Sequence, residues 1–123
     1  MAHLIRALVP FVHVRSVPES ISFYEKLGMT IGNTFVPPEA SEPVWAWLQS
    51  GIAQVMLAKE SEPVVASQQT VLFYLYVEDV AAKREELRDG GVPVGDIQYP
   101  FYAPRGEFRI TDPDGYVLMI SHT

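Results

Sequence analysis

The stretch VRSVPESISFYEKLGMTIG, residues 14–32, is repeated in outline 63 positions later as VEDVAAKREELRDGGVPVG, residues 77–95. The third position of each copy, Ser16 or Asp79, is a residue type that often caps the N-terminus of a helix. A glycine follows each helical pattern, as expected where a helix ends. Internal similarity at a fixed offset indicates a duplicated structural unit.

The two copies predict the same order of elements. An apolar strand, 8–14 or 71–77, precedes each capped helix, and three more strands follow it. The expected following strands are 30–36, 44–49, 53–59, 93–99, 106–111 and 116–121. The sequence therefore predicts an α+β fold. We expect a single domain, 1–123, of two tandem βαβββ modules at about 5–62 and 68–122, forming a curved mixed sheet with a concave cup.

The composition excludes several classes of protein. The net charge of −6 argues against a nucleic-acid-binding surface, which needs clustered Lys and Arg. No apolar run approaches the roughly 20 residues of a membrane span, and the first residues do not resemble a signal peptide. Without cysteine the chain has no thiolate metal site. We expect a cytoplasmic protein without nucleic-acid or membrane partners.

Two hairpins set the expected strand register. Residues Ser50 and Gly51 are a plausible two-residue turn, which would pair Trp47 with Gln54 and Trp45 with Met56. In the last hairpin Pro113, Asp114 and Gly115 are expected to form a three-residue loop with Gly115 left-handed. The pairs that this second loop predicts are Arg109 with Met119 and Glu107 with Ser121.

Alternation along the strands separates an aliphatic face, suited to packing under the helices, from a face rich in aromatic side chains. The aromatic face also carries His, Gln, Glu and Arg, which is unusual for a plain core, although a core or a dimer interface remains an alternative. A concave face of this kind is the usual form of a small-molecule site. The candidate ligand-binding residues are Phe11, His13, Trp45, Trp47, Gln54, Met56, Leu72, Tyr74, Tyr76, Arg105, Glu107, Arg109 and Met119.

Several candidates have two interpretations. His13 is either a ligand partner or general base, or a histidine satisfied within the core. Arg109 either pairs with Glu107 or anchors a ligand carboxylate. Arg105 lies in the segment FYAPRG, which is either a lid with Phe101 and Tyr102 at its tip or an ordinary exposed loop.

The repeat, together with SISFYEKLG, VEDVAAKREELRDGGV and EFRITDPDGYVLMI, resembles the vicinal oxygen chelate superfamily over about residues 5–122. This group contains glyoxalases, bleomycin-resistance proteins and extradiol dioxygenases. Its enzymes hold one divalent metal through His, Glu or Gln at four strand positions. Carried over, the resemblance implies that these positions are Val9, Met56, Leu72 and Met119, none of which has a nitrogen or oxygen donor. We therefore expect no metal and no cofactor.

Among the members of the superfamily, the chain is most similar to the metal-free, homodimeric binding proteins of the bleomycin-resistance type. The resemblance implies a homodimer that binds an aromatic or amphipathic small molecule, with antibiotic sequestration as one candidate role. The alternative is an enzyme, a glyoxalase-like lyase or a dioxygenase, in which His13, Gln54 and Glu107 serve as displaced metal ligands. A metal-free enzyme would instead use His13 and Glu107 for acid–base chemistry. A third interpretation is a scaffold whose cup is filled by its own side chains.

Overall fold

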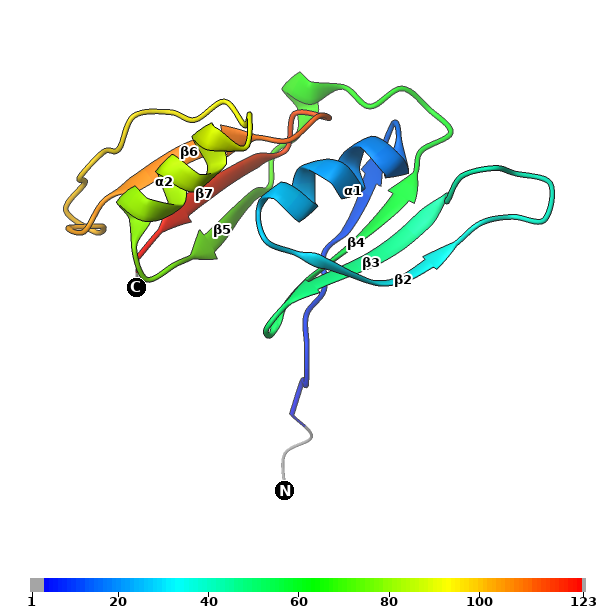
Figure 1. Cartoon of the computed structure of the whole chain (residues 1–123), viewed down its shortest axis with the longest axis horizontal. Coiled ribbons are helices and arrows are strands. Elements are labelled where there is room, and N and C mark those ends of the chain that lie inside the picture. The colour runs from blue at the N-terminus through cyan, green and yellow to red at the C-terminus, as the bar shows by residue number, and fades with distance from the viewer. Residues whose placement is uncertain (1–3, 123) are drawn as a thin grey trace. The chain divides into compact units, whose positions relative to one another are not determined.

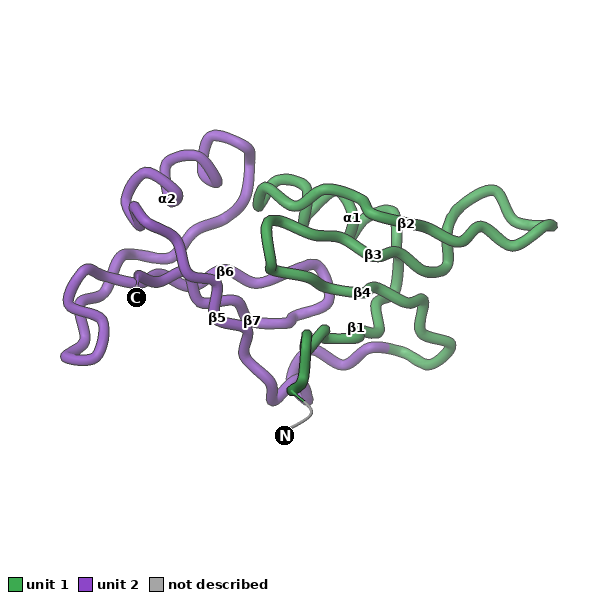
Figure 2. The backbone as a smooth tube through the Cα atoms, turned by 90° about the horizontal axis from the view of Figure 1, so that it is seen from below, with its two compact units in different colours: residues 1–63 green, residues 64–123 purple. Residues whose placement is uncertain are grey.

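The computed structural model describes residues 4–122. The chain divides into two compact units, with the boundary between residues 63 and 64 (Figure 2). Each unit has one helix longer than a single turn and one sheet, of four strands in the first unit and three in the second. The α+β class is thus confirmed, and the strands are hydrogen-bonded into two sheets, one for each unit. No helix among residues 4–122 is long and apolar enough to cross a membrane.

The first unit contains one helix and four strands (Figure 1). The elements are β1 (Phe11–Val14), α1 (Val17–Lys26), β2 (Thr30–Phe35), β3 (Trp45–Ser50) and β4 (Ala53–Lys59). The strand order is β1-β4-β3-β2, with β1 parallel to β4 and the other neighbours antiparallel. Strand β1 begins three residues later than predicted, after Pro10, which has no N–H to donate to a ladder.

Helix α1 begins as its sequence predicts. The side chain of Ser16 accepts a hydrogen bond from the Glu19 N–H at 3.2 Å, which satisfies one of the free amides of the first turn. Pro18 lies in that first turn, where its missing N–H costs nothing. Gly28 follows the helix with a φ of 106°, a conformation that favours glycine.

The β3–β4 hairpin differs from the predicted register. Ser50 pairs with Ala53, so the two loop residues are Gly51 and Ile52, and Trp47 pairs with Met56 rather than with Gln54. Gly51 has a φ of 58°, and no residue other than glycine has a positive φ among the described residues. A two-residue turn of type II′ needs glycine first, so Gly51 must open the loop. The shift moves each partner by two residues, and the predicted faces are therefore unchanged.

The second unit repeats this arrangement. Its elements are η1 (Ala66–Gln68), β5 (Leu72–Tyr76), α2 (Val80–Asp89), β6 (Glu107–Thr111) and β7 (Val117–Ser121). The strand order β5-β7-β6, with β5 parallel to β7, matches β1-β4-β3. Asp79 caps α2 by accepting from the Ala82 N–H at 2.9 Å, as predicted. The short helix η1 was not expected from the sequence.

The strand predicted over 93–99 does not form, which is the main error of the sequence-based fold. The segment runs alongside β6 but forms backbone hydrogen bonds with it at only two places. The Gly95 N–H donates to Arg109 O at 3.0 Å, and Gln98 and Glu107 exchange two bonds at 2.8 and 2.9 Å. These two places are out of register by one residue, and Pro93 contributes no donor, so a continuous ladder cannot form.

The last hairpin has the predicted register, with Glu107 opposite Ser121 and Arg109 opposite Met119. Its loop has Gly115 at a φ of 89°, as expected for a bulged three-residue connection. Asp112 Oδ1 accepts from the N–H groups of Asp114 and Tyr116, both at 2.9 Å, which holds the loop closed. Charge-assisted bonds to backbone amides are among the stronger hydrogen bonds in proteins.

Each sheet has one buried and one partly exposed face. Helix α1 lies against β3 and β4, and α2 lies against β6. The predicted division is confirmed in β1, β3, β4, β6 and β7, where the side chains expected to face the helices are buried and the aromatic side chains of the other face are half-buried or exposed. In β5 the helix-side residues Phe73 and Leu75 are only half-buried, and every residue of β2 is exposed. The buried apolar strand residues are Val12, Val14, Ala46, Leu48, Val55, Leu57, Phe108, Ile110, Leu118 and Ile120. Glu107 and Ser121, on the opposite face of the second sheet, are buried as well.

Candidate functional site

The partly exposed face of the first sheet carries both tryptophans. The Trp47 indole N–H donates to Gln54 Oε1 at 3.0 Å, so the amide fixes the orientation of the ring. That ring lies directly over Gly32, where an added Cβ would come within 2.6 Å of Trp47 Cε3. Gly32 stands at the irregularity in the pairing of β2 with β3. The small residue at 32 thus leaves room for a large flat side chain on this face.

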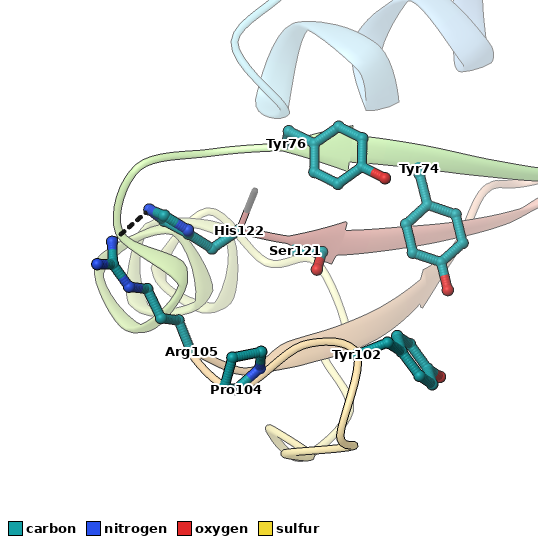
Figure 3. A pocket seen from close by; sticks show the side chains of 7 residues that line it. All are labelled: Tyr74, Tyr76, Tyr102, Pro104, Arg105, Ser121 and His122. Carbon is teal, nitrogen blue, oxygen red and sulfur yellow. Dashed lines mark hydrogen bonds between the residues drawn. The ribbon is translucent and has the colours of Figure 1, made fainter.

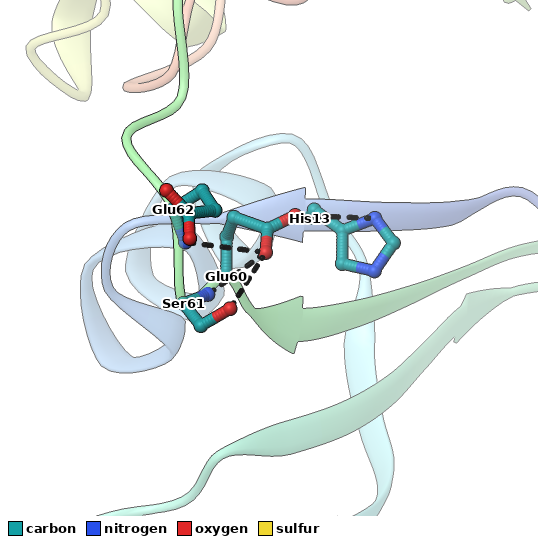
Figure 4. Close-up of polar contacts among 4 residues, drawn as sticks. All are labelled: His13, Glu60, Ser61 and Glu62. Atoms are coloured by element: carbon teal, nitrogen blue, oxygen red, sulfur yellow. Dashed lines mark hydrogen bonds and ion pairs between the residues drawn. The ribbon is translucent and has the colours of Figure 1, made fainter.

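His13 lies on the same face and is exposed. Its ring meets Phe11 edge-on, with the two centroids 5.3 Å apart. Its Nδ1 lies 3.9 Å from Glu60 Oε2, at the end of the sheet (Figure 4). The N–H groups of Ser61 and Glu62 donate to Glu60 Oε1 and, with a smaller contribution from His13, lower the pKa of the Glu60 carboxyl. His13 is therefore directed at Glu60.

The second unit contains a pocket of about 380 Å³ at the end of β5 and β7 (Figure 3). Strand β5 contributes two tyrosines, a serine comes from the end of β7 and a histidine from the residue after it, and the loop before β6 supplies the remaining wall. The lining residues are Tyr74, Tyr76, Tyr102, Pro104, Arg105, Ser121 and His122.

Aromatic rings form one side of this pocket. Tyr74 and Tyr76 are two apart on β5, so they project from the same face, with their ring centroids 6.0 Å apart at an angle of 31°. Ser121 is paired with Tyr76 and presents its hydroxyl between these rings and the loop that carries Tyr102 (Figure 3). The surface combines flat apolar area with hydroxyl groups that can orient a ligand.

The other end of the pocket is basic. Arg105 Nη1 lies 3.0 Å from His122 Nε2, and Figure 3 shows this contact at the end away from Tyr74 and Tyr102. A guanidinium only donates, so His122 Nε2 is the acceptor in this contact. Among the described residues Arg105 has no carboxylate partner.

A buried acidic group lies behind the pocket. Glu107 is only 3% exposed, and its Oε2 has no hydrogen-bond partner among the described residues. It stands opposite Ser121 in the β6–β7 pairing. A hydrogen bond with Glu107, together with its charge, raises the pKa of the exposed Tyr102 hydroxyl.

The second unit brings three of the candidate ligand residues, Tyr74, Tyr76 and Arg105, into one pocket. Leu72, Arg109 and Met119 are on the same sheet face but do not line this pocket. Of the two interpretations of Arg109, the internal ion pair with Glu107 is not formed. In the first unit the candidates share the exposed sheet face and are Phe11, His13, Trp45, Trp47, Gln54 and Met56.

Sequence reasoning missed Pro104 and His122 as pocket residues, and it assigned Ser121 to the face without proposing a role. His122 follows the last strand and carries no periodic signal of its own. Its role in the pocket could be recognised only from its contact with Arg105, which lies 17 residues away along the chain.

Comparison with known proteins agrees with this geometry. Residues 3–120 match the family model described as Glyoxalase/Bleomycin resistance protein/Dioxygenase superfamily. The chain belongs to this superfamily. No match was found among curated proteins.

Members of the superfamily with solved structures share the fold of the chain at low identity. A bleomycin resistance determinant encoded on the transposon Tn5 is 16% identical, with a TM-score of 0.77 over 97% of this chain and 98% of that one. The bleomycin-binding protein of Streptomyces verticillus, solved with copper(II)-bleomycin, is also 16% identical, with a TM-score of 0.73 over 100% and 99%. A protein from Bacillus anthracis assigned to the glyoxalase family is 20% identical, with a TM-score of 0.75 over 100% and 99%.

The side chains at the four positions where the resemblance implies metal ligands do not suit a divalent ion. Val9 and Leu72 are hydrocarbons, and Met56 and Met119 offer only thioether sulfur, which is a poor ligand for hard cations. Residues 4–122 contain no group of three or more His, Asp or Glu side chains arranged to hold an ion.

Two of the displaced metal ligands considered from the sequence, His13 and Gln54, belong to the first unit and do not lie together there. His13 pairs with Ala58 on β4, four residues along that strand from Gln54, or about 13 Å at the rise of a strand. His13 is directed at Glu60, and Gln54 is bonded to Trp47. The two side chains therefore have separate partners.

Proposed function

We propose that this member of the superfamily binds an aromatic or amphipathic small molecule without a metal or another cofactor. The observation that carries the proposal is the pocket of the second unit, where tyrosine rings, a serine hydroxyl and an arginine converge on about 380 Å³. Small-molecule sites typically enclose about 300–1,000 Å³ and combine aromatic walls with a few polar groups. This pocket has both properties.

Two further points support binding rather than metal-dependent catalysis. The side chains at the superfamily's metal positions lack suitable donors. Solved structures of similar fold include proteins that bind bleomycin, and sequestration of an antibiotic is accordingly one role that we propose to test. We also propose that the protein acts in the cytoplasm as a homodimer, as its resemblance to the bleomycin-resistance type implies.

The proposal predicts that ligands from a broad small-molecule library raise the melting temperature, because a ligand that binds only the native state stabilises it. For each hit we would compare Tyr76→Ala with Tyr99→Ala by calorimetry. Both tyrosines are largely exposed, at 59% and 68%, but only Tyr76 lines the pocket. Loss of an aromatic wall is worth about 1 kcal/mol, so Tyr76→Ala should weaken binding roughly fivefold.

Tyr99→Ala should bind like the parent protein. Equal affinity for all three proteins would show that the hits bind elsewhere. A variant with Trp45 and Trp47 both changed to Ala then tests the exposed face of the first sheet as a second aromatic surface. A library without any stabilising compound would favour a scaffold that binds nothing.

A second candidate function, metal-free acid–base catalysis, is favoured by Glu107. A buried carboxylate with an unpartnered oxygen beside a pocket is a feature of catalytic acids and bases. Mass spectrometry of each hit after incubation would separate the two functions. Conversion by the parent protein that is lost in Glu107→Gln would indicate an enzyme, whereas an unchanged compound supports binding.

A further inference from the structure

We infer that the pocket of the second unit selects ligands in which an anionic group, such as a carboxylate, is joined to a flat apolar body. This inference rests on the proposed binding function and names the class of ligand. The anion would bind Arg105, and the flat body would lie against Tyr74 and Tyr76.

The charge of the lining is the first argument. Arg105 is the permanently charged residue that lines the pocket, and no Asp or Glu is among the lining residues. A guanidinium has five N–H donors in a planar fork. The structure shows one contact, from Nη1 to His122, which leaves further donors for a ligand. A fork of this geometry matches the two oxygens of a carboxylate.

The arrangement of the remaining groups is the second argument. Tyr74 and Tyr76 offer ring faces and hydroxyls on one side, while Ser121 offers a hydroxyl close to them (Figure 3). Arg105 lies at the opposite end from Tyr74 and Tyr102 in this view. A ligand that satisfied both ends would therefore have its charge at one end and its apolar part at the other.

No acidic side chain among the described residues lines the pocket to attract a cation in place of an anion. Glu107 is buried behind the pocket and is not part of its lining. Its hydrogen bond with Tyr102 and its charge raise the pKa of that hydroxyl. The net charge of −6 repels anions at long range, so selectivity for an anion must come from direct contact with Arg105.

The test uses three probes of one shape and different charge, namely 2-naphthoate, 2-naphthamide and 2-naphthylmethylammonium. Each is titrated into the full chain, and binding is followed by amide shifts in two-dimensional NMR. We expect 2-naphthoate to bind at least about tenfold more tightly than the amide, with shifts at Ser121 and His122, and to bind more tightly than the ammonium compound.

Arg105→Gln should abolish this preference, and Arg105→Lys should retain part of it, because the charge remains while the fork is lost. The matched control is Arg88→Gln, which makes the same change of charge on α2, where Arg88 pairs with Glu85 at 2.8 Å outside the pocket. Arg88→Gln should leave the preference for 2-naphthoate unchanged. Urea unfolding of each variant checks that it is folded.

Four outcomes would overturn the inference. Three concern preference, namely equal affinity for the three probes, tighter binding of the ammonium compound, and a preference for 2-naphthoate that survives Arg105→Gln. The fourth is absence of 2-naphthoate binding at millimolar concentration. If neutral or cationic compounds still bind at Ser121 and His122, only the inference about charge fails. If no compound of any charge binds there, the proposed function fails as well.

Discussion

At the scale of single residues, the pairing of Tyr102 with Glu107 has a consequence that can be measured. Glu107 is buried, and Tyr102 is 61% exposed on the loop above it. Because the neighbouring carboxylate accepts a hydrogen bond from the neutral phenol and repels the phenolate, it raises the pKa of Tyr102. The other carboxylate oxygen of Glu107, Oε2, is buried without a hydrogen-bond partner among the described residues.

We predict that Tyr102 titrates above the ordinary tyrosine value near 10 and that Glu107→Gln lowers its pKa toward that value. The measurement is a pH titration of ¹³C-labelled tyrosine by NMR. The pKa is raised in the folded state, so the stabilisation from this pair is present below the unfolded pKa and is lost as the pH rises through the folded pKa. A pKa of Tyr102 that is the same in both proteins would contradict the pairing.

At the scale of elements, the two hairpin loops differ in how their glycines are placed. Gly51 and Gly115 both have a positive φ, at 58° and 89°. Around Gly51 an added Cβ would meet nothing within 4 Å, whereas at Gly115 it would overlap the Cβ of Ala66 and lie 2.9 Å from the Cα of that residue. Helix η1, which contains Ala66, therefore packs directly on the last loop.

This contrast predicts different costs for one substitution. Gly51→Ala should destabilise the protein by about 1–2 kcal/mol, the cost of a left-handed conformation for a residue with a Cβ. Gly115→Ala should cost about 1–3 kcal/mol more, because it also overpacks the contact with Ala66. Urea unfolding of both variants gives the two free energies. Equal costs would mean that η1 moves aside without penalty.

The elements also show which patterns carry information. The capped starts at Ser16 and Asp79 and the loop at Gly115 follow from local chemistry and were predicted correctly. The turn at Gly51 was displaced by one residue, because the dipeptide alone does not say which of its positions takes the positive φ. The strand expected over 93–99 would need a continuous ladder of hydrogen bonds with β6. The alternation of side chains along 93–99 does not ensure that such a ladder forms.

At the scale of the whole molecule, apolar side chains remain exposed in the first unit. They include Phe11 and Phe35 on the sheet, and Leu4, Ile5 and Leu8 before it. Apolar side chains of this kind are ones that an interface could bury. Their exposure agrees with the proposal of a homodimer.

We predict a mass of about twice the 13.8 kDa of one chain in light scattering after gel filtration, constant over a dilution series at micromolar concentration. An obligate dimer would also unfold at a midpoint that rises with protein concentration, since association stabilises the native state by mass action. A mass of one chain throughout the series would contradict the proposal.

The amino-acid sequence by itself determined the duplication, the two capped helices, the last hairpin and, in β1, β3, β4, β6 and β7, the division into a helix-facing and an aromatic face. These features depend on spacings of a few residues, and local sterics and hydrogen bonding enforce them. Only the tertiary structure decided that Arg105 contacts His122 and that the buried Glu107 interacts with Tyr102. It also decided that 93–99 runs alongside β6 without joining its sheet. Each of these depends on segments that are distant in the chain, so the positions of both partners had to be known.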